Sequence, residues 1–140
     1  MADDLVGAMK IAGSGLEAQT QRLRVVSENL ANVHSTGTTP GADPYARKTI
    51  TFSSVLDQAA GTEMVRVESI GLSPEPFRVE KNPAHPAADA EGNVKLPNVS
   101  MIVELADMRE ANRSYEANLQ VVKQARDMIS MTIDLLRRGG

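Results

Sequence analysis

The chain has 140 residues, a length that suits one domain of ordinary size and not two well-buried cores. Its net charge of -3, from 15 basic and 18 acidic residues mixed along the chain, does not favour a nucleic acid or an anionic membrane as partner. Cysteine is absent, which excludes disulfides and zinc–thiolate sites, and aromatic residues make up only 3%, so few large side chains can anchor a compact interior.

The first residues include acidic Asp3 and Asp4, and no apolar run long enough for a signal peptide or a membrane span follows them. We therefore expect neither secretion by the general route nor direct membrane insertion.

Apolar residues recur from Leu5 to Leu30 in alternating steps of four and three, with Gln19 as the one polar interruption. This spacing predicts an amphipathic helix that ends near residues 32–35, where the sequence becomes polar and glycine-rich. Three glycines between residues 7 and 15 each cost about 1 kcal/mol relative to alanine, so we expect this helix to be marginal by itself.

Residues 35–97 predict loops and short strands. Turn-forming residues crowd 39–44, and prolines punctuate the later part of the segment, which limits strand length. Alternating apolar pairs place four short strands around Ile50 and Phe52, Val65 and Val67, Phe77 and Val79, and Val94 and Leu96.

The steps of four and three return between Met101 and Leu136 and predict a second helix over residues 98–138. At about 1.5 Å per residue it would be roughly 60 Å long, which exceeds the helices of ordinary globular domains. Asn98 or Ser100 can accept hydrogen bonds from its first amides, and Arg137 and Arg138 suit its negative end.

The predicted fold class is mainly α with a small β insert. We divide the chain into an N-terminal helix at 1–34, a loop and β-containing outer domain at 35–97, and a long C-terminal helix at 98–140. The two helices offer each other matching apolar stripes and are expected to pair as an antiparallel coiled coil. The predicted assembly seam consists of Leu5, Met9, Leu16, Leu23, Val26, Leu30, Met101, Leu105, Met108, Tyr115, Leu119, Val122, Ile129, Ile133 and Leu136.

Candidate sites for chemistry are weak. Gly13-x-Gly15-x-x-Ala18 superficially matches a dinucleotide-binding loop, but no strand precedes it and the heptad pattern passes through it. His34 and His85 are far apart in the sequence, and His85 lies in a proline-flanked turn that favours a solvated loop over a metal site. We predict no metal, no cofactor and no small-molecule substrate.

Glu104 and Asp107 lie one turn apart on the second helix and invite comparison with a carboxylate pair. From residue 98 onward, however, the chain carries six acidic and six basic residues, a balance typical of a charged outer helix face. Since no nucleophile, histidine and acid are arranged in a recognisable motif, we predict that the protein is not an enzyme.

The segment Ser27-Glu28-Asn29-Leu30-Ala31-Asn32 resembles the Ser-x-Asn-Leu-Ala-Asn motif that closes the N-terminal helix of flagellar axial proteins, the family of rod and hook subunits. The runs at 73–78, 82–92, 96–99 and 111–118 are similar to the proximal rod members of that family. One departure is a longer proline and glycine loop that separates residues 35–37 from residues 45–48. The motif residues are Ser27, Asn29, Leu30, Ala31 and Asn32.

The resemblance implies a structural subunit of the proximal rod of the flagellar basal body, the drive shaft that crosses the periplasm and is needed for motility. It implies export in an unfolded state by the flagellar type III apparatus, followed by self-assembly with the terminal helices paired. The implied partners are other rod proteins, the junction protein at the rod base, further copies of the chain and, during transit, the export apparatus. An alternative is a coiled-coil adaptor or export chaperone of a secretion system, which would share the heptads but need neither the β insert nor matched terminal helices.

Overall fold

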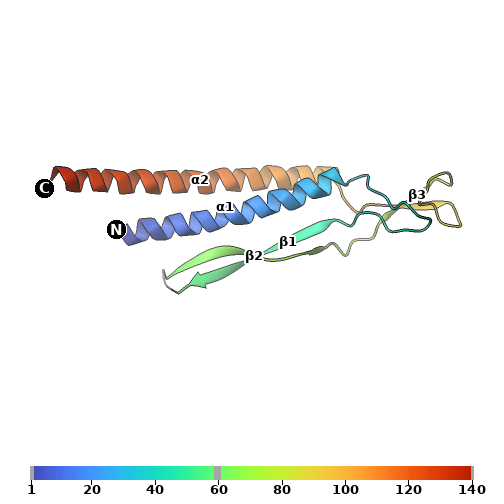
Figure 1. Ribbon diagram of the computed structural model, residues 1–140, viewed down its shortest axis with the longest axis horizontal. Coiled ribbons are helices and arrows are strands. Elements are labelled where there is room, and N and C mark those ends of the chain that lie inside the picture. Colours follow the sequence, from blue (N-terminus) through green and yellow to red (C-terminus); the bar gives the residue numbers. More distant parts are fainter. Residues whose placement is uncertain (1, 59–60, 140) are drawn as a thin grey trace. The chain divides into compact units, whose positions relative to one another are not determined.

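The structure is a computed structural model that describes residues 2–58 and 61–139 (Figure 1). Two long helices, α1 (Ala2–Ala31) and α2 (Met101–Arg138), flank four strands, β1 (Lys48–Asp57), β2 (Thr62–Leu72), β3 (Arg78–Lys81) and β4 (Asn93–Leu96). The strands form two two-stranded sheets, β1–β2 and β3–β4. The prediction of two terminal helices around a small β insert is confirmed. No helix in the described ranges is long and apolar enough to cross a membrane.

The chain divides into two compact units. Unit 1 comprises Met1–Arg22, Thr51–Glu68 and Glu110–Gly140, and unit 2 comprises Leu23–Ile50 and Ser69–Arg109. Each unit therefore contains a part of both helices and a part of the β1–β2 hairpin.

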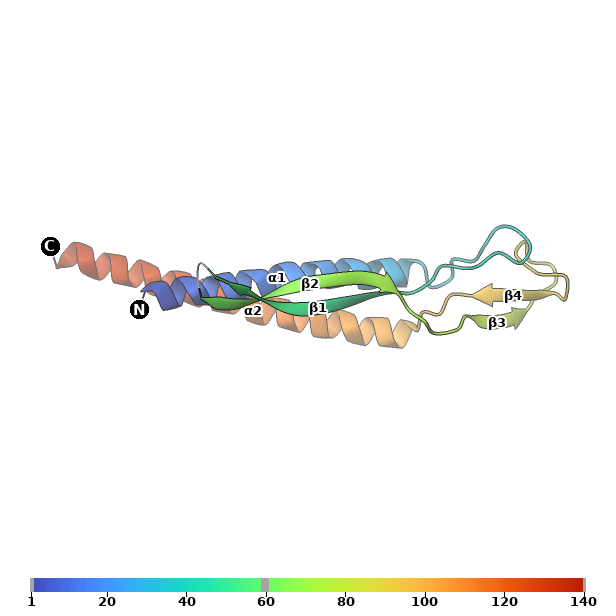
Figure 2. The same cartoon turned by 90° about the horizontal axis from the view of Figure 1, so that it is seen from below.

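In unit 1, the first helix lies beside α2 and beside the β1–β2 hairpin (Figures 1 and 2). The backbone amide of Val65 in β2 donates to the Ser14 hydroxyl at 3.1 Å, and the Lys10 ammonium lies 3.8 Å from the Asp57 carboxylate. Gly61 adopts a positive φ of 65° and donates its amide to the Asp57 carbonyl at 2.7 Å. A residue with a side chain would be strained at this turn.

The interior of unit 1 is built from small residues. Its buried residues, among those the structure describes, are all glycine or alanine: Gly7, Ala12, Gly15, Ala18, Ala111 and Ala125. A Cβ added to Gly15 would lie 2.7 Å from the Asn118 amide nitrogen of α2. The two helices therefore approach each other closely, and their large aliphatic side chains are left at the edges of the contact.

This close approach predicts opposite outcomes for two neighbouring glycines. Gly13→Ala is expected to stabilise unit 1 by about 1 kcal/mol, because alanine favours helix and nothing lies within 4 Å of the added Cβ. Gly15→Ala brings the same backbone gain but displaces the Asn118 amide, which donates to the Ser114 carbonyl at 3.0 Å. We expect it to be about 1–3 kcal/mol less stable than Gly13→Ala in chemical denaturation. Equal stabilities would contradict the close approach.

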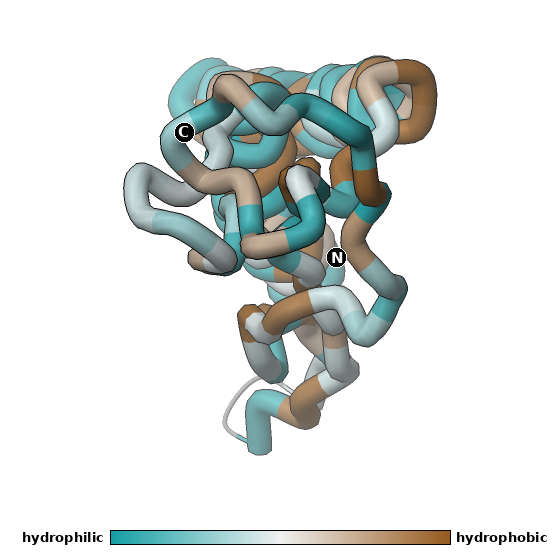
Figure 3. The backbone as a smooth tube through the Cα atoms, turned by 90° about the vertical axis from the view of Figure 1, so that its right-hand side faces the viewer, coloured by the Kyte–Doolittle hydropathy of each residue, from teal (hydrophilic) through white to brown (hydrophobic). Residues whose placement is uncertain are grey.

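Unit 2 has a core of larger residues. Val25, Val26, Val33, Val94 and Val99 are buried there. The β3–β4 hairpin is antiparallel, with register from Arg78 opposite Leu96 to Lys81 opposite Asn93. Hydrophobic and hydrophilic stretches follow one another at short intervals along the backbone (Figure 3).

Candidate functional site

A buried polar network in unit 2 joins the end of α1, the start of β1 and the start of α2. At its centre is Asn29, which is 1% exposed. Its amide nitrogen donates to the Lys48 carbonyl at 2.9 Å and to the Glu104 carboxylate at 3.3 Å. Its amide oxygen accepts from the Tyr45 hydroxyl at 2.7 Å and from the Lys48 backbone amide at 2.9 Å. One side chain thus uses its two donors and two acceptor positions to connect three segments.

Glu104 is the second member of the network and is fully buried. The Arg47 side chain donates from Nε to the Glu104 carboxylate and from its terminal nitrogen to the Asp107 carboxylate at 3.3 Å. The interpretation of this acidic pair as part of a charged outer face is therefore wrong for Glu104. A buried carboxylate requires such a partner, because desolvation without compensation costs several kcal/mol.

Asn98 extends the network to a further segment. Its side-chain oxygen accepts from the Arg47 backbone amide at 2.7 Å, and its side-chain nitrogen donates to the Glu75 carbonyl at 2.8 Å. Asn98 therefore connects the residue before β1 to the segment before β3, and its amide oxygen does not serve as the predicted cap of α2. The first bond of α2 runs from the Glu104 amide to the Ser100 carbonyl at 3.0 Å.

The other motif residues have different positions. Asn32 directly follows the last residue of α1. Its side-chain nitrogen donates to the Glu28 carbonyl at 2.9 Å, and its side-chain oxygen accepts from the Ser35 hydroxyl at 2.9 Å. Leu30 is half-buried, and Ser27 and Ala31 are exposed. The network thus contains one residue of the motif, Asn29, whereas Tyr45 and Arg47 come from the segment beyond the longer loop.

The pKa of Tyr45 reflects its burial and the charges of the network. Burial raises the pKa of its phenol above the ordinary value of 10.0, and the negative charges of Glu28 and Glu104 raise the pKa further. Because the folded protein keeps this proton at a pH where the unfolded chain releases it, its contribution to stability is complete below about pH 10 and is lost as the pH rises through the folded pKa.

Tyr45→Phe tests this assignment. The variant loses the hydrogen bond to Asn29 and should be about 1 kcal/mol less stable at neutral pH. Its stability should then decline less steeply than that of the unchanged chain above about pH 10. Urea unfolding over a pH series measures both effects, and a decline as steep as before would contradict the assignment.

The predicted seam residues fall into three groups. Val26 is buried. The half-buried members are Leu5, Met9, Leu16, Leu23, Leu30, Met108, Tyr115, Leu119, Val122 and Ile129. The exposed members are Met101, Leu105, Ile133 and Leu136, at 48%, 51%, 47% and 73%. Part of the stripe on α2 is thus covered by the chain itself, and part is open.

The weak candidates for chemistry do not form a site. Gly13 and Gly15 lie within the continuous helix α1, as the heptad pattern predicts. His34 is exposed, and the ring of His85 accepts from the Ala87 amide at 3.0 Å within its turn. Across the described residues, no group of three or more histidine, cysteine, aspartate or glutamate side chains could hold a metal ion.

Comparisons with known proteins identify the class. The family described as flagella basal body rod protein matches residues 9–37, and the family described as flagellar basal body rod FlgEFG protein C-terminal matches residues 90–135. These segments contain most of α1 and α2. The chain is accordingly a structural protein of the flagellar basal-body rod class and not an enzyme.

Individual relatives narrow the class to one family. The chain is 60% identical over 135 residues to the flagellar basal-body rod protein FlgC of Agrobacterium fabrum, with 96% of this chain and 97% of the relative covered. It is 39% identical to FlgC of Escherichia coli O157:H7, over 94% of this chain and 97% of the relative, and 36% identical to FlgC of Borreliella burgdorferi, over 95% and 98%. The chain belongs to the FlgC family of flagellar basal-body rod proteins. Its place is the rod of the basal body, and the alternative of an adaptor or chaperone is not supported.

Proposed function

We propose that the chain builds the proximal part of the rod by burying the exposed seam residues of α2 against neighbouring subunits. In the assembled state, α1 and α2 are paired as an antiparallel coiled coil. The observation that supports this proposal is that small residues are buried in unit 1 whereas large apolar residues are exposed. Gly15, Ala111 and Ala125 occupy the buried interior of unit 1, whereas Ile133 and Leu136 are 47% and 73% exposed. Apolar side chains exposed in series along one helix favour burial against another chain.

The network around Asn29 and Glu104 serves this function by fixing where α1 ends and α2 begins. Because the buried ion pair has a single geometry that satisfies its donors and acceptors, it sets the relative register of the two helices. Helices in register present one continuous outer surface to a neighbouring subunit.

Membership of the rod family supports a proposal for the partners and for the export route. The proposed partners are other rod proteins, the junction protein at the rod base and further copies, reached after export in an unfolded state by the flagellar type III apparatus into the periplasm. The division into rod-core helices at 1–34 and 98–140 and an outer domain at 35–97 is part of the same proposal. Retention of the chain inside cells that lack the export apparatus tests the route.

Ile133→Asp tests the use of the open stripe. Because the side chain is already 47% exposed, the change should leave the isolated chain folded. In an assembled rod it would bury an unpaired charge at a cost of several kcal/mol, so we expect cells with this variant to lack rods and motility. Electron microscopy of isolated basal bodies and swimming in soft agar measure the result.

The matched control is Gln124→Asp. Gln124 is also exposed, and it lies nine residues from Ile133, which at about 100° per residue places it on the opposite side of α2. This variant carries the same new charge and a loss of helix propensity that is no smaller, and it should retain motility. Motile cells with Ile133→Asp would refute the seam.

A further inference from the structure

The loop at residues 35–45, in unit 2, is closed on itself. Its two ends are joined by the Tyr45 amide, which donates to the Ser35 carbonyl at 2.9 Å. Its interior is tightly packed, because a Cβ added to Gly37 would lie 2.5 Å from the Cβ of Ala42. A surface loop whose ends meet and whose own residues pack together behaves as one body. Its position on unit 2 is therefore set by the contacts that it makes with other segments.

A backbone bond and a histidine ring attach this loop to the turn at residues 82–88. The Gly41 amide donates to the Ala87 carbonyl at 3.1 Å, and the Thr36 hydroxyl lies 3.3 Å from Nε2 of His85. Ala87 is 2% exposed, and its own amide donates to Nδ1 of His85 at 3.0 Å. The His85 ring thus contacts the loop through Thr36 and also fixes the residue that binds Gly41.

These hydrogen bonds define the protonation state of His85. A backbone amide can only donate, so Nδ1 accepts from Ala87 and carries no proton. The single proton of the neutral ring is then on Nε2, from which it is donated to the Thr36 hydroxyl. A second proton would set an Nδ1–H group against the Ala87 N–H group and leave a buried amide without its acceptor. The docked loop is compatible with the neutral ring alone.

Charged groups on the segments that meet at His85 do not compensate for a second proton. These groups are Asp43 on the loop, Asp89 and Glu91 beyond the turn, and Lys81 and Lys95 at the ends of the flanking strands. Asp43 pairs with Lys95 at 2.9 Å, and Asp89 accepts from two backbone amides. Within the described ranges no ion pair includes His85. The Asp43–Lys95 side chains are 68% and 46% exposed, so this pair alone holds the loop only weakly.

We propose that His85 makes the docking of the loop sensitive to pH: the neutral ring holds residues 35–45 on the turn at 82–88, and the protonated ring releases them. Because the docked state excludes the second proton, docking is complete where the ring is neutral and is lost as the pH falls. An imidazole changes its charge between about pH 5 and pH 8. The surface at this end of unit 2 then differs between neutral and acidic surroundings. This inference does not depend on the proposed function, since it concerns a contact within a single chain.

Hydrogen exchange of individual amides, followed by NMR on the purified full chain at about pH 8 and about pH 5, tests the contact. After correction for the intrinsic effect of pH on exchange, protection of the Gly41 and Ala87 amides should fall about tenfold or more in acid. The Lys48 amide, which donates to the Asn29 side chain at 2.9 Å, is the internal reference and should remain protected. Equal protection of Gly41 and Ala87 at both pH values would overturn the proposal. So would a parallel loss at Lys48, which would mean that unit 2 unfolds as a whole.

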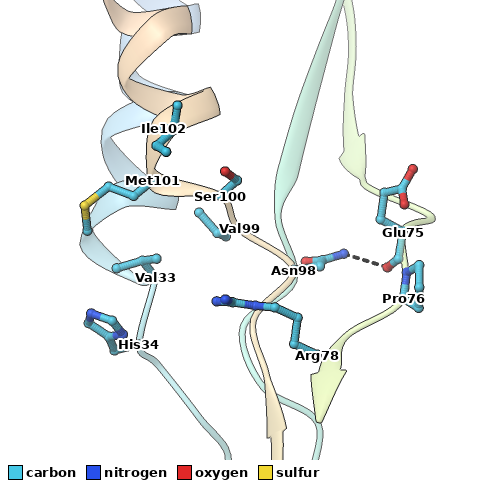
Figure 4. Close-up of a pocket in the computed structure, with 10 residues that line it drawn as sticks. All are labelled: Val33, His34, Glu75, Pro76, Arg78, Asn98, Val99, Ser100, Met101 and Ile102. Atoms are coloured by element: carbon cyan, nitrogen blue, oxygen red, sulfur yellow. Dashed lines mark hydrogen bonds between the residues drawn. The ribbon is translucent and has the colours of Figure 1, made fainter. Parts of the chain in front are cut away.

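His85→Asn and His34→Asn are the matched variants. The side-chain oxygen of asparagine can replace Nδ1 as the acceptor of the Ala87 amide, but it does not titrate. His85→Asn should therefore keep Ala87 protected at both pH values and abolish the tenfold difference. His34, the other histidine, is exposed in the segment that follows α1 (Figure 4), so His34→Asn should retain the full difference. A difference that survives in His85→Asn would show that another group is responsible.

If His85→Asn releases the loop at every pH, the ring nitrogens of the unchanged chain decide the question. Their NMR shifts should place the proton on Nε2 at about pH 8 and show the gain of a proton on Nδ1 as the pH falls. That gain should occur over the same pH range in which Gly41 loses protection. A ring that gains its second proton while Gly41 stays protected contradicts the proposal.

Discussion

Replacing Glu104 by alanine is expected to destabilise unit 2 by about 3–5 kcal/mol, because the change leaves the Arg47 guanidinium with its main partner missing. Glu104 is fully buried, and the side chain of Arg47 is only 24% exposed, so water cannot replace the lost carboxylate at little cost. The same change removes an acceptor of the Asn29 amide. For a domain whose total stability is about 5–15 kcal/mol, this is a large fraction. Urea unfolding of the purified chain measures the loss.

Glu110→Ala is the matched control for this prediction. Glu110 lies on the same helix and pairs with Arg22 at 3.3 Å, but its side chain is 68% exposed. The helix-propensity gain from glutamate to alanine is the same at both positions, and an exposed pair contributes about 0–1 kcal/mol. Glu104→Gln keeps an acceptor and removes the charge, so its stability should lie between that of Glu104→Ala and that of the unchanged chain. Similar small losses for Glu104→Ala and Glu110→Ala would show that the buried ion pair contributes little.

The sequence predicted the elements of the fold well because their signals are local. The steps of four and three marked both helices, and alternation at Val65 and Val67 and at Val94 and Leu96 marked β2 and β4. Phe77 was placed in a strand, and β3 begins one residue later at Arg78. Each of these signals needs only residues close in the chain.

The partner of Glu104 could not be predicted in the same way. Arg47 is separated from it by 57 residues, and the two meet only in the folded chain. No periodicity marks such a pair, and the balance of acidic and basic residues along the helix favoured an exposed position for Glu104. The motif did indicate Asn29, but it carried no information about the groups that Asn29 binds.

The sequence also could not divide the helix stripe into its covered and open parts. Ala111 and Ala125 stand beside the predicted seam, and the structure buries them at 0% and 4%, whereas their neighbours Asn112 and Arg126 are exposed. Periodicity finds an apolar stripe but does not say which chain covers it. Alanine at the buried positions is the signal that could have shown the closer approach of the two helices.

Asn29→Ala is expected to cost about 3 kcal/mol or more, although it removes only a small side chain. The unchanged amide makes four hydrogen bonds, and its loss leaves the Lys48 amide and carbonyl, the Tyr45 hydroxyl and the Glu104 carboxylate each without one partner. Leaving a buried polar group unsatisfied costs about 1–3 kcal/mol, and some of these groups retain other contacts. Denaturant unfolding compares the variant with Asn32→Ala, which removes two half-buried bonds at the helix end and should cost about 1 kcal/mol.

Asn29→Asp separates hydrogen bonding from shape at the same position. Aspartate has nearly the same volume and can still accept from Tyr45 and Lys48, but its carboxylate cannot donate to the Lys48 carbonyl and places a second negative charge beside buried Glu104. We expect it to be at least as destabilising as alanine in spite of the better fit. An aspartate variant as stable as the unchanged chain would mean that Asn29 fills space and does not hold α1, β1 and α2 together. Loss of rods in cells carrying Asn29→Asp but not in cells carrying Asn32→Ala would connect this network to assembly, because only the first change disturbs the register of the two helices.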